Sequence, residues 1–206
     1  MKLKAVFLDK DGTLIPDIPY NVDPKKVTLS EGVVEGLQIL QSHGYLLVIV
    51  SNQSGIARGY FSIEQLNAVK ERISRMCSNV GIYLDGFYYC PHHPDGIISG
   101  YDQECDCRKP NPGLLLKAAD DMDIDLANSW MIGDILHDVE AGHRGGCKSI
   151  LINNGNETEW KPGEYRMPEF FAKDLTEAAK YIVAATKVRS NEKKLERKAK
   201  YIMHKA

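Results

Sequence analysis

The stretch Lys4-Ala-Val-Phe-Leu-Asp-Lys-Asp-Gly-Thr13 is the part of the sequence that decides the fold. It begins with Lys4 and a short apolar run over 5–8, which together predict a β-strand over 4–8. Two acidic residues, Asp9 and Asp11, follow this run directly, and Gly12-Thr13 then predicts a turn. Acidic side chains at the end of a buried strand fit an α/β protein, because parallel sheets bind ligands beyond the carboxyl ends of their strands.

The rest of the chain alternates strand and helix in the same way. Further apolar runs predict strands at 46–50, 87–89, 130–132 and 149–152. Caps such as Ser30, and a capping box of Ser62 with Gln65, predict helices at about 30–44, 62–79, 112–122 and 174–187. This order favours an α/β fold with three layers, Rossmann-like, around a mostly parallel sheet. The segment 157–171 is expected to be irregular.

Length and composition narrow the class of protein. The chain has 206 residues and a formal net charge of −2, so its charge does not indicate a nucleic-acid binder. No apolar run approaches the ~18 residues of a membrane span, and the start lacks a secretory pattern, so a cytoplasmic location is expected. Residues 187–206 hold eight Lys or Arg against two Glu. We therefore expect one domain over 1–187 and a basic helical tail over 188–206, which is either a solvated extension, a partner contact or a weak binder of anionic surfaces.

Polar residues follow three of the predicted strands. Asp9 and Asp11 follow the first, Ser51-Asn-Gln53 the second, and Gly133-Asp134 the fourth. Two acids one residue apart point the same way in an extended chain, and their charges repel unless a cation lies between them. Carboxylate oxygens are the ligands that Mg²⁺ prefers, so this edge of the sheet is a candidate magnesium site. Each residue taken alone also fits a helix cap or a turn.

Taken in order, these segments resemble the four motifs of the haloacid dehalogenase (HAD) superfamily of phosphatases: Asp9-Lys-Asp-Gly-Thr13, Ser51, Lys109, and Gly133-Asp134 with Asp138. Three longer stretches narrow the resemblance to the D-glycero-D-manno-heptose 1,7-bisphosphate phosphatases, of which histidinol-phosphate phosphatases are close relatives: 51–59, 90–94 and 105–110. The resemblance covers roughly residues 1–155. One position departs from it, because Ile135 stands where the heptose phosphatases usually have Lys.

The resemblance implies a Mg²⁺-dependent phosphatase. Asp9 would be the nucleophile that takes the phosphoryl group as an aspartyl-phosphate, and Asp11 the general acid and base. Ser51 and Lys109 would stabilise the transferring phosphoryl group. The residues expected to hold or orient Mg²⁺ are Asp9, Asp11 through its carbonyl, Asp134, and Asp138 in the surrounding shell.

A second metal site is predicted in the loop over 90–108. Cys90-Pro-His92 and Cys105-Asp-Cys107, with twelve residues between them, supply three cysteines and a histidine, which is a known structural zinc set. A disulfide is the alternative, but a ring joining Cys105 to Cys107 would be strained. His93 is the alternative ligand, and the resemblance favours His92. The zinc would fix the loop that ends in Arg108 and Lys109.

Short spacings between the motifs leave no room for a large cap domain, so loops must set the specificity. The residues expected to bind substrate are Asp17, Tyr20, Asn52, Gln53, Ser54, Arg58 and Arg108. Packing for Tyr20 and a surface charge for Arg58 are the alternatives. The resemblance implies removal of the C7 phosphate of the heptose bisphosphate, in nucleotide-activated heptose synthesis for lipopolysaccharide or surface glycans. The chain is expected to be a monomer. Histidinol phosphate or another small sugar phosphate is the alternative substrate, and a zinc-stabilised binding module is the non-enzyme alternative.

Overall fold

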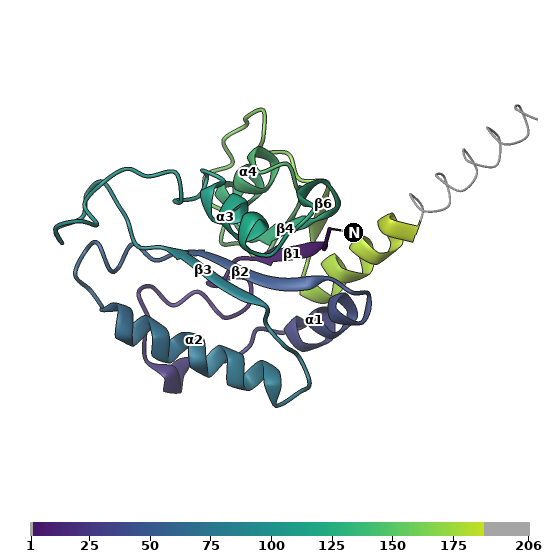
Figure 1. Ribbon diagram of the computed structural model, residues 1–206, viewed down its shortest axis with the longest axis horizontal. Coiled ribbons are helices and arrows are strands. Elements are labelled where there is room, and N and C mark those ends of the chain that lie inside the picture. Colours follow the sequence, from purple (N-terminus) through teal and green to yellow (C-terminus); the bar gives the residue numbers. More distant parts are fainter. Residues whose placement is uncertain (1, 188–206) are drawn as a thin grey trace, which may run out of the picture.

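Six short segments form one parallel sheet in the computed structural model, which describes residues 2–187 (Figure 1). The strands are β1 Ala5–Leu8, β2 Leu46–Asn52, β3 Gly86–Cys90, β4 Trp130–Gly133, β5 Lys148–Ile152 and β6 Phe170–Ala172. They lie in the order β3-β2-β1-β4-β5-β6, and all neighbouring pairs are parallel. Strands β2 and β3 are added on one side of β1, and strands β4, β5 and β6 on the other, so the order of strands reverses at β1. The crevice at the carboxyl ends of β1 and β4 is therefore where a sheet of this topology binds its ligand.

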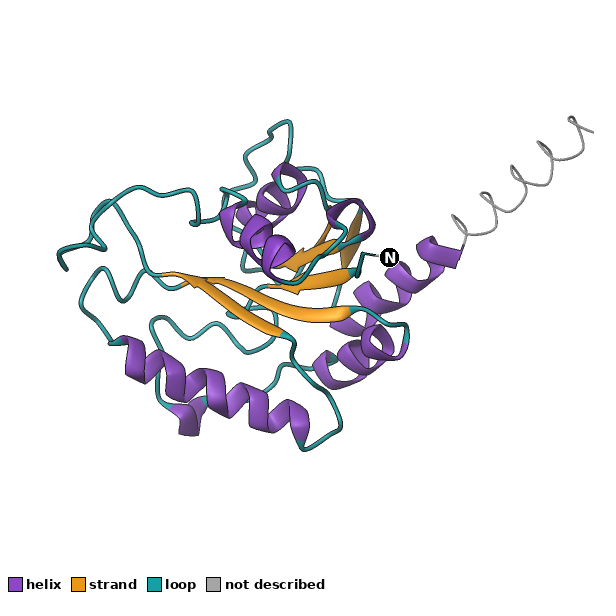
Figure 2. Ribbon diagram, in the orientation of Figure 1, coloured by secondary structure: helices purple, strands orange, loops and turns teal. Residues whose placement is uncertain are grey.

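Helices cover both faces of the sheet and complete three layers (Figure 2). The regular helices are α1 Val33–Ser42, α2 Ile63–Ser78, α3 Gly113–Asp121 and α4 Leu136–Arg144, and residues 175–187 are also helical. Two short 3₁₀ helices are η1 Pro24–Lys26 and η2 Leu126–Asn128. The core beneath α1, α2 and 175–187 is separate from the core beneath α3 and α4. The predicted three-layer α/β fold is confirmed.

The first strand shows how the sequence builds both cores. Val6 and Leu8 pack in the core with α1 and α2, whereas Ala5 and Phe7 pack on the opposite face with α3. All four side chains are fully buried. A parallel sheet with both faces covered needs such a continuous apolar strand, since neither face meets water. The first polar residue after it, Asp9, is thereby held at the end of the strand.

The capping box is present as predicted. The Ser62 hydroxyl accepts a hydrogen bond from the Gln65 backbone N–H at 3.4 Å, and the Gln65 side chain accepts one from the Ser62 N–H at 2.9 Å. These two bonds satisfy N–H groups that would have no partner at the start of α2. The five predicted strands also form, with bounds that differ by one or two residues.

Helix α4 and strand β6 were not predicted from the sequence, nor were the two short 3₁₀ helices. Helix α4 begins after Ile135, which has no side chain able to cap a helix, and Asp138 accepts the Ile135 N–H instead at 3.3 Å. Strand β6 has only three residues, too few to show an alternating pattern, and its first two residues lie at the end of the segment 157–171 that was expected to be irregular. It forms because the sheet offers an open edge at β5 and because Phe170 stacks on Tyr181 with ring centroids 4.3 Å apart.

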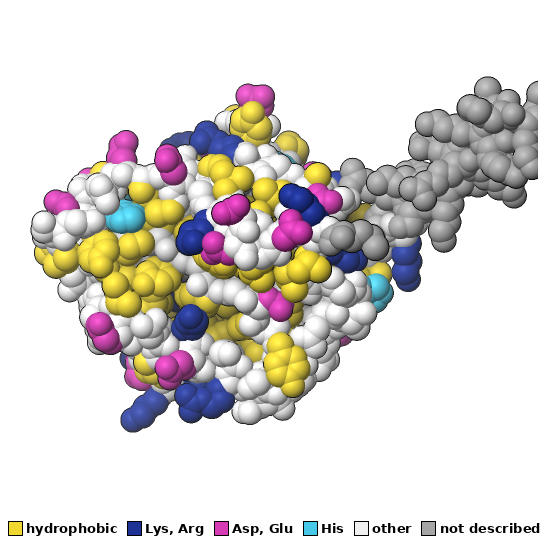
Figure 3. Space-filling view, viewed as in Figure 1, with side chains coloured by type: hydrophobic (Ala, Val, Ile, Leu, Met, Phe, Trp, Pro, Cys, Tyr) yellow, Lys and Arg dark blue, Asp and Glu magenta, His cyan; other side chains and the backbone are white. Residues whose placement is uncertain are grey.

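The connections between strands contain no large cap domain within residues 2–187, as predicted. None of the helices in this part of the chain is long and apolar enough to cross a membrane. On the face shown in Figure 3, acidic and basic side chains are interspersed, as expected for a net charge of −2. The predicted basic tail over 188–206 lies outside the described residues, so the division at residue 187 stays a prediction.

A buried serine fixes the start of β1. The Ser129 hydroxyl accepts a hydrogen bond from the Ala5 N–H at 2.9 Å and donates one to the Asp125 carbonyl at 2.6 Å. Ser129 is fully buried, so neither bond is exchanged for water. The contact joins the beginning of the first strand to the segment that leads into β4.

We predict that Ser129→Ala lowers the free energy of unfolding by about 1–3 kcal/mol, because the buried Ala5 N–H loses its acceptor. Urea unfolding followed by circular dichroism measures the change. Ser78→Ala is the matched control, since the Ser78 hydroxyl donates only to the Arg75 carbonyl on an exposed turn. Equal unfolding free energies for the two variants would contradict the assigned role of Ser129.

Candidate active site

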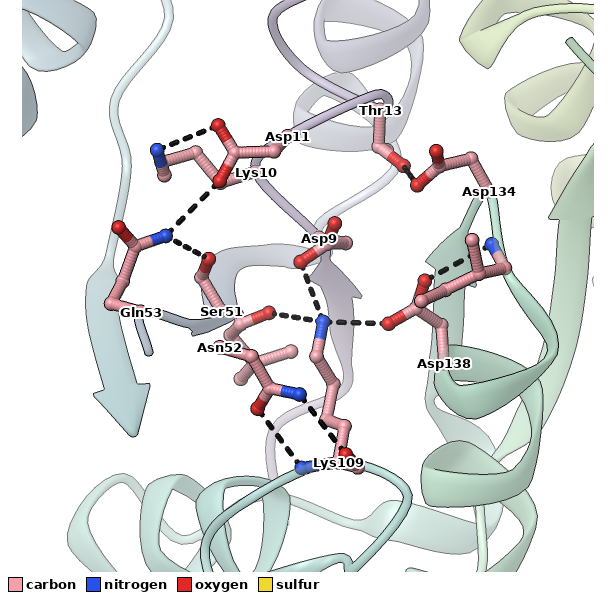
Figure 4. A network of polar contacts seen from close by, with 12 residues as sticks. Asp9, Lys10, Asp11, Thr13, Ser51, Asn52, Gln53, Lys109, Asp134 and Asp138 are labelled. Carbon is pink, nitrogen blue, oxygen red and sulfur yellow. Dashed lines mark hydrogen bonds and ion pairs between the residues drawn. The ribbon is translucent and has the colours of Figure 1, made fainter. Parts of the chain in front are cut away.

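The candidate active site lies at the carboxyl ends of β1, β2 and β4 (Figure 4). Asp9 follows β1, and its backbone N–H donates to the Ile132 carbonyl in β4 at 2.9 Å. Asp134 follows β4, and Ser51 lies near the end of β2. The side chains of Asp9, Asp134 and Ser51 are all buried. Parallel pairing of the three strands therefore gathers polar groups that lie far apart in the sequence.

Lys109 is the buried cation of this site. Its ammonium group donates to Asp9 Oδ1 at 2.5 Å and to the Val50 carbonyl at 3.0 Å, and it pairs with Asp138 Oδ1 at 2.6 Å. Burial acts to lower the pKa of Lys109, but the charges of Asp138 and Asp9 outweigh it and raise the pKa above its usual value. The ammonium group therefore stays charged where a phosphate would approach Asp9.

Three buried carboxylates form a group that fits a metal ion. Asp9, Asp134 and Asp138 each offer one oxygen, and these oxygens lie within 4.8 Å of one another. Burial raises the pKa of Asp9 well above its usual value, against the opposing charge of Lys109. Burial and the neighbouring charge of Asp138 raise the pKa of Asp134 to about 6. A hard divalent cation with oxygen ligands would relieve this repulsion, so the residues present fit Mg²⁺.

Two of the predicted magnesium ligands lie together in the structure, and a third carboxylate joins them. The structure brings Asp9 and Asp134 together as expected. Asp138, expected only to orient the surrounding shell, joins them through its carboxylate and also pairs with Lys109. The carboxylate of Asp11 does not belong to this group, in agreement with a role for its carbonyl oxygen alone.

Asp11 instead lies on the wall of the neighbouring pocket. Its Oδ1 accepts a hydrogen bond from the Lys10 ammonium at 2.8 Å, and its Oδ2 accepts one from the Gln53 amide at 3.0 Å. The same Gln53 nitrogen donates to the Ser51 hydroxyl at 2.8 Å. These contacts hold the Asp11 carboxylate beside the nucleophile candidate Asp9 and in reach of the pocket, which is where a general acid must act.

Asn52 uses both ends of its side chain to position Lys109. Its amide nitrogen donates to the Lys109 carbonyl at 3.0 Å, and its amide oxygen accepts from the Lys109 N–H at 3.0 Å. The paired bonds fasten a loop without regular structure to the end of β2. Asn52 was predicted as a substrate-binding residue, and the geometry gives it this positioning role first.

A pocket of about 270 Å³ opens beside Asp11. Its lining includes six of the residues expected to contact substrate or act on it: Asp11, Asp17, Tyr20, Asn52, Gln53 and Ser54. Burial and the charge of Asp11 raise the pKa of Asp17. At the rim, Tyr20 adopts a left-handed backbone conformation with φ of 54° and meets Tyr60 edge to face at 4.5 Å. Strained residues of this kind cluster at ligand sites.

Arg58 and Arg108 form a second cationic group around His93. One terminal nitrogen of Arg58 lies 3.0 Å from His93 Nε2, and burial together with the charges of Arg108 and Arg58 lowers the pKa of His93. Among the described residues, Arg58 Nε and Arg108 Nη1 are buried without a hydrogen-bond partner. Buried donors without partners are costly, so these two nitrogens fit an anionic group of a ligand.

The four predicted zinc ligands lie together. Cys105 Sγ is 3.4 Å from Cys90 Sγ and 3.2 Å from Cys107 Sγ, and His92 Nδ1 is 3.4 Å from Cys107 Sγ. Sulfur atoms in a disulfide are about 2.05 Å apart, and the cysteines here are free. Hydrogen bonds from Cys90, Cys105 and His92 lower the pKa of the Cys107 thiol to about 5, against the opposing effect of burial. Three cysteines and a histidine whose ligand atoms lie this close together fit a tetrahedral Zn²⁺.

His93, the alternative ligand, faces away from this set toward Arg58. The loop around the set is tied to the rest of the site by its backbone. The N–H groups of Ile97 and Ile98 both donate to the Ala57 carbonyl, at 2.7 and 3.0 Å, and the Gln53 N–H donates to the Cys90 carbonyl at 2.8 Å. The zinc loop therefore positions the segments that carry Arg58, Arg108 and Lys109.

Two contacts on Asp134 were not predicted from the sequence. The Thr13 hydroxyl donates to Asp134 Oδ1 at 3.2 Å, and the Asn156 amide donates to Asp134 Oδ2 at 2.7 Å. Thr13 belongs to the first motif, so the sequence could have indicated its place near Asp134. Asn156 follows β5 in a segment without a motif, so nothing in the sequence indicated its contact. Gly12 has a φ of +79°, and a Cβ there would lie 2.0 Å from Asp134 Oδ2. Only glycine lets the turn pass this close.

Comparison with known proteins agrees with this site. The family described as HAD-hydrolase-like matches residues 106–178. The D-glycero-beta-D-manno-heptose-1,7-bisphosphate 7-phosphatase of Pasteurella multocida is 46% identical over 153 residues, which cover 74% of this chain and 83% of that protein. The enzyme of the same name from Escherichia coli K12 is 40% identical over 165 residues, covering 80% and 83% of the two chains.

A solved structure shows the same arrangement of the chain. The D,D-heptose 1,7-bisphosphate phosphatase from B. bronchiseptica, complexed with magnesium and phosphate, superposes with a TM-score of 0.76 at 31% identity, covering 89% of this chain and 99% of that one. A HAD-like phosphatase from Mesorhizobium loti gives the same TM-score at 32% identity, covering 88% of each chain. The chain therefore belongs to the heptose-1,7-bisphosphate 7-phosphatase family of HAD-like hydrolases.

Proposed function

We propose that this chain removes the C7 phosphate from D-glycero-β-D-manno-heptose 1,7-bisphosphate in a Mg²⁺-dependent reaction. The observation that carries the proposal is the placement of Asp9, which lies against the buried Lys109 cation and beside two further carboxylates that fit Mg²⁺. The named activity of relatives at 40–47% identity supports this choice of substrate. A cytoplasmic location and a monomeric state stay predictions.

Asp9 and Asp11 divide the chemistry between them. An Asp9 oxygen attacks phosphorus, the bond from phosphorus to the C7 oxygen breaks, and Asp11 gives its proton to that oxygen. Water then attacks the aspartyl-phosphate, Asp11 takes the proton from the water, and phosphate leaves with Asp9 restored. Bound Mg²⁺ supplies positive charge that lets two anions, the carboxylate and the phosphate, approach each other.

Lys109 and the end of β2 complete the phosphate site. The Lys109 ammonium pairs with Asp9, and the Ser51 hydroxyl accepts a hydrogen bond from the Gln53 amide that also donates to Asp11. A transferring phosphoryl group spreads negative charge over three oxygens, so a fixed cation and fixed donors around it lower the barrier.

The second phosphate of the substrate meets the two arginines. Arg58 Nε and Arg108 Nη1 are buried donors without partners, and a guanidinium group binds phosphate with two parallel bonds. The pocket beside Asp11 would then take the sugar, with Asp17, Tyr20 and Ser54 on its wall. The single phosphate of histidinol phosphate would leave the arginines without an anion.

The role of Asp9 is tested by Asp9→Asn. We expect phosphatase activity to fall by roughly 10⁴-fold or more, because the amide cannot form the phosphoryl intermediate. Asp11→Asn is expected to lose about 10²- to 10⁴-fold, as befits a proton donor. Release of inorganic phosphate measures both.

Asp120→Asn on the exposed face of α3 is the matched control and is expected to keep full activity. Activity close to that of the unaltered chain in Asp9→Asn would refute the mechanism.

The zinc set is tested by elemental analysis. The purified chain is expected to hold about one Zn²⁺, and Cys105→Ser is expected to lose it, because one of the four ligands is gone. The variant should also show a higher KM, since the loop that holds Arg108 is loosened. Cys77→Ala, which changes a cysteine outside the set, should keep its zinc. Zinc-free protein with an ordered loop would remove this assignment.

The arginine site is tested by Arg58→Lys, which keeps the charge but not the forked geometry. We expect KM for the heptose bisphosphate to rise about tenfold, or ~1.4 kcal/mol, with kcat nearly unchanged. The unaltered chain should prefer the bisphosphate to histidinol phosphate, and the substitution should leave histidinol phosphate turnover unchanged.

Arg75→Lys near the end of α2 is the control for a surface arginine. Equal or faster hydrolysis of histidinol phosphate by the unaltered chain would overturn the proposed substrate.

A further inference from the structure

The segment that follows β5 lies against the candidate magnesium site. It leaves the sheet at Ile152, and within a few residues Asn154 and Asn156 each donate a hydrogen bond into the catalytic edge. The Asn154 amide donates to the Gly12 carbonyl at 2.7 Å, and the Asn156 amide donates to Asp134 Oδ2 at 2.7 Å. This part of the chain lies at the end of the family resemblance and carries none of its motifs.

Both oxygens of Asp134 are held by donors from different parts of the chain. Thr13 donates to Oδ1 and Asn156 to Oδ2. Two donors on the two oxygens fix the plane of a carboxylate, whereas one donor leaves it free to rotate. Each oxygen still has a second lone pair, so Asp134 can face a cation without losing either bond.

We propose that Asn156 is a positioning residue for magnesium, which holds the Asp134 carboxylate in the orientation that binds the ion. The inference rests on the proposed function, because it takes Asp134 as a Mg²⁺ ligand. The Asn156 side chain donates to Asp134, and Asn156 does not line the pocket beside Asp11, so its proposed effect on the metal runs through Asp134. Partners of this kind orient metal ligands and strengthen metal binding.

Asn156 is itself held in place on both sides. Its N–H donates to the Asn154 side-chain oxygen at 3.1 Å, which ties it to the turn at Gly12. On the other side, the Glu157 carboxylate accepts the Leu136 N–H at the start of α4 at 2.6 Å. The segment thus bridges the end of β1 and the helix that carries Asp138. An asparagine fixed at both neighbours is poised to hold Asp134 at little cost in entropy.

The turn at Gly12 packs closely against the Asn156 side chain. A Cβ on Gly12 would lie 2.5 Å from the Asn156 amide nitrogen, as well as on Asp134. The turn at Gly12 therefore lies directly against both Asp134 and Asn156, with no room for a side chain at position 12. The contact between Asn156 and Asp134 is part of a packed unit.

The test is Asn156→Ala in the full chain, with Mg²⁺ binding measured by calorimetry. We expect the dissociation constant for Mg²⁺ to rise about ten- to hundredfold. The melting temperature without Mg²⁺ should stay unchanged, since Asn156 is exposed. With saturating Mg²⁺, kcat should return to within about twofold of its normal value, because the substrate contacts are intact.

Two further variants separate the hydrogen bond from other effects. Asn156→Leu keeps the side-chain volume but has no donor, so it should bind Mg²⁺ as weakly as the alanine variant. Asn128→Ala removes an amide that donates to Asp125 at 2.7 Å away from the site, and should bind Mg²⁺ normally.

Unaltered Mg²⁺ affinity in either Asn156 variant would overturn the inference and leave the proposed function standing. If the unaltered chain itself failed to bind Mg²⁺, the metal site of the proposed function would fall, and this inference with it.

Discussion

A lysine buried between two aspartates is the interaction on which the site depends. Lys109 lies against Asp9 and Asp138 at the point where the sheet topology reverses, and all three side chains are nearly or wholly removed from water. Burying a carboxylate alone raises its pKa and favours the neutral acid, which is a poor nucleophile. The ammonium group of Lys109 opposes this rise in the pKa of Asp9. It also lets a third acid, Asp134, lie within a few ångströms, so that a divalent cation has a set of oxygens to bind.

The cation arrives on a loop rather than on a strand or a helix, and this explains much of the surrounding structure. Irregular backbone is hard to hold in place, because its polar groups lack regular partners. Here Asn52 pairs with both backbone groups of Lys109, and the Asn111 amide donates to the Cys105 carbonyl at 2.9 Å. The Cys and His set closes the same loop a few residues earlier. These hydrogen bonds hold Lys109 in place, as the apolar core holds the strands.

The sequence was most informative where one short segment carries the whole signal. The apolar runs predicted the sheet, the Ser62 box predicted the start of α2, and acids after β1 and β4 predicted where a metal would lie. It was least informative where a residue depends on distant partners. Strand β6 exists because β5 offers an edge, and Asp138 and Asn156 acquire their contacts only when α4 and the segment after β5 meet the first motif. Contacts between segments that lie far apart in the sequence leave no local pattern from which they could be predicted.

Arg108 and Lys109 are neighbours in the chain, yet one lies by His93 and the other by Asp9. A single peptide unit therefore joins Arg108, which we propose meets one phosphate, to Lys109, which lies where the other would react. Under the proposed function, the distance between the two phosphates of the substrate must therefore match the distance between two adjacent side chains. A change in the length of the loop ahead of Arg108 would move both cations together and leave the distance between them unchanged, so this one peptide unit sets the separation that the proposed substrate must match.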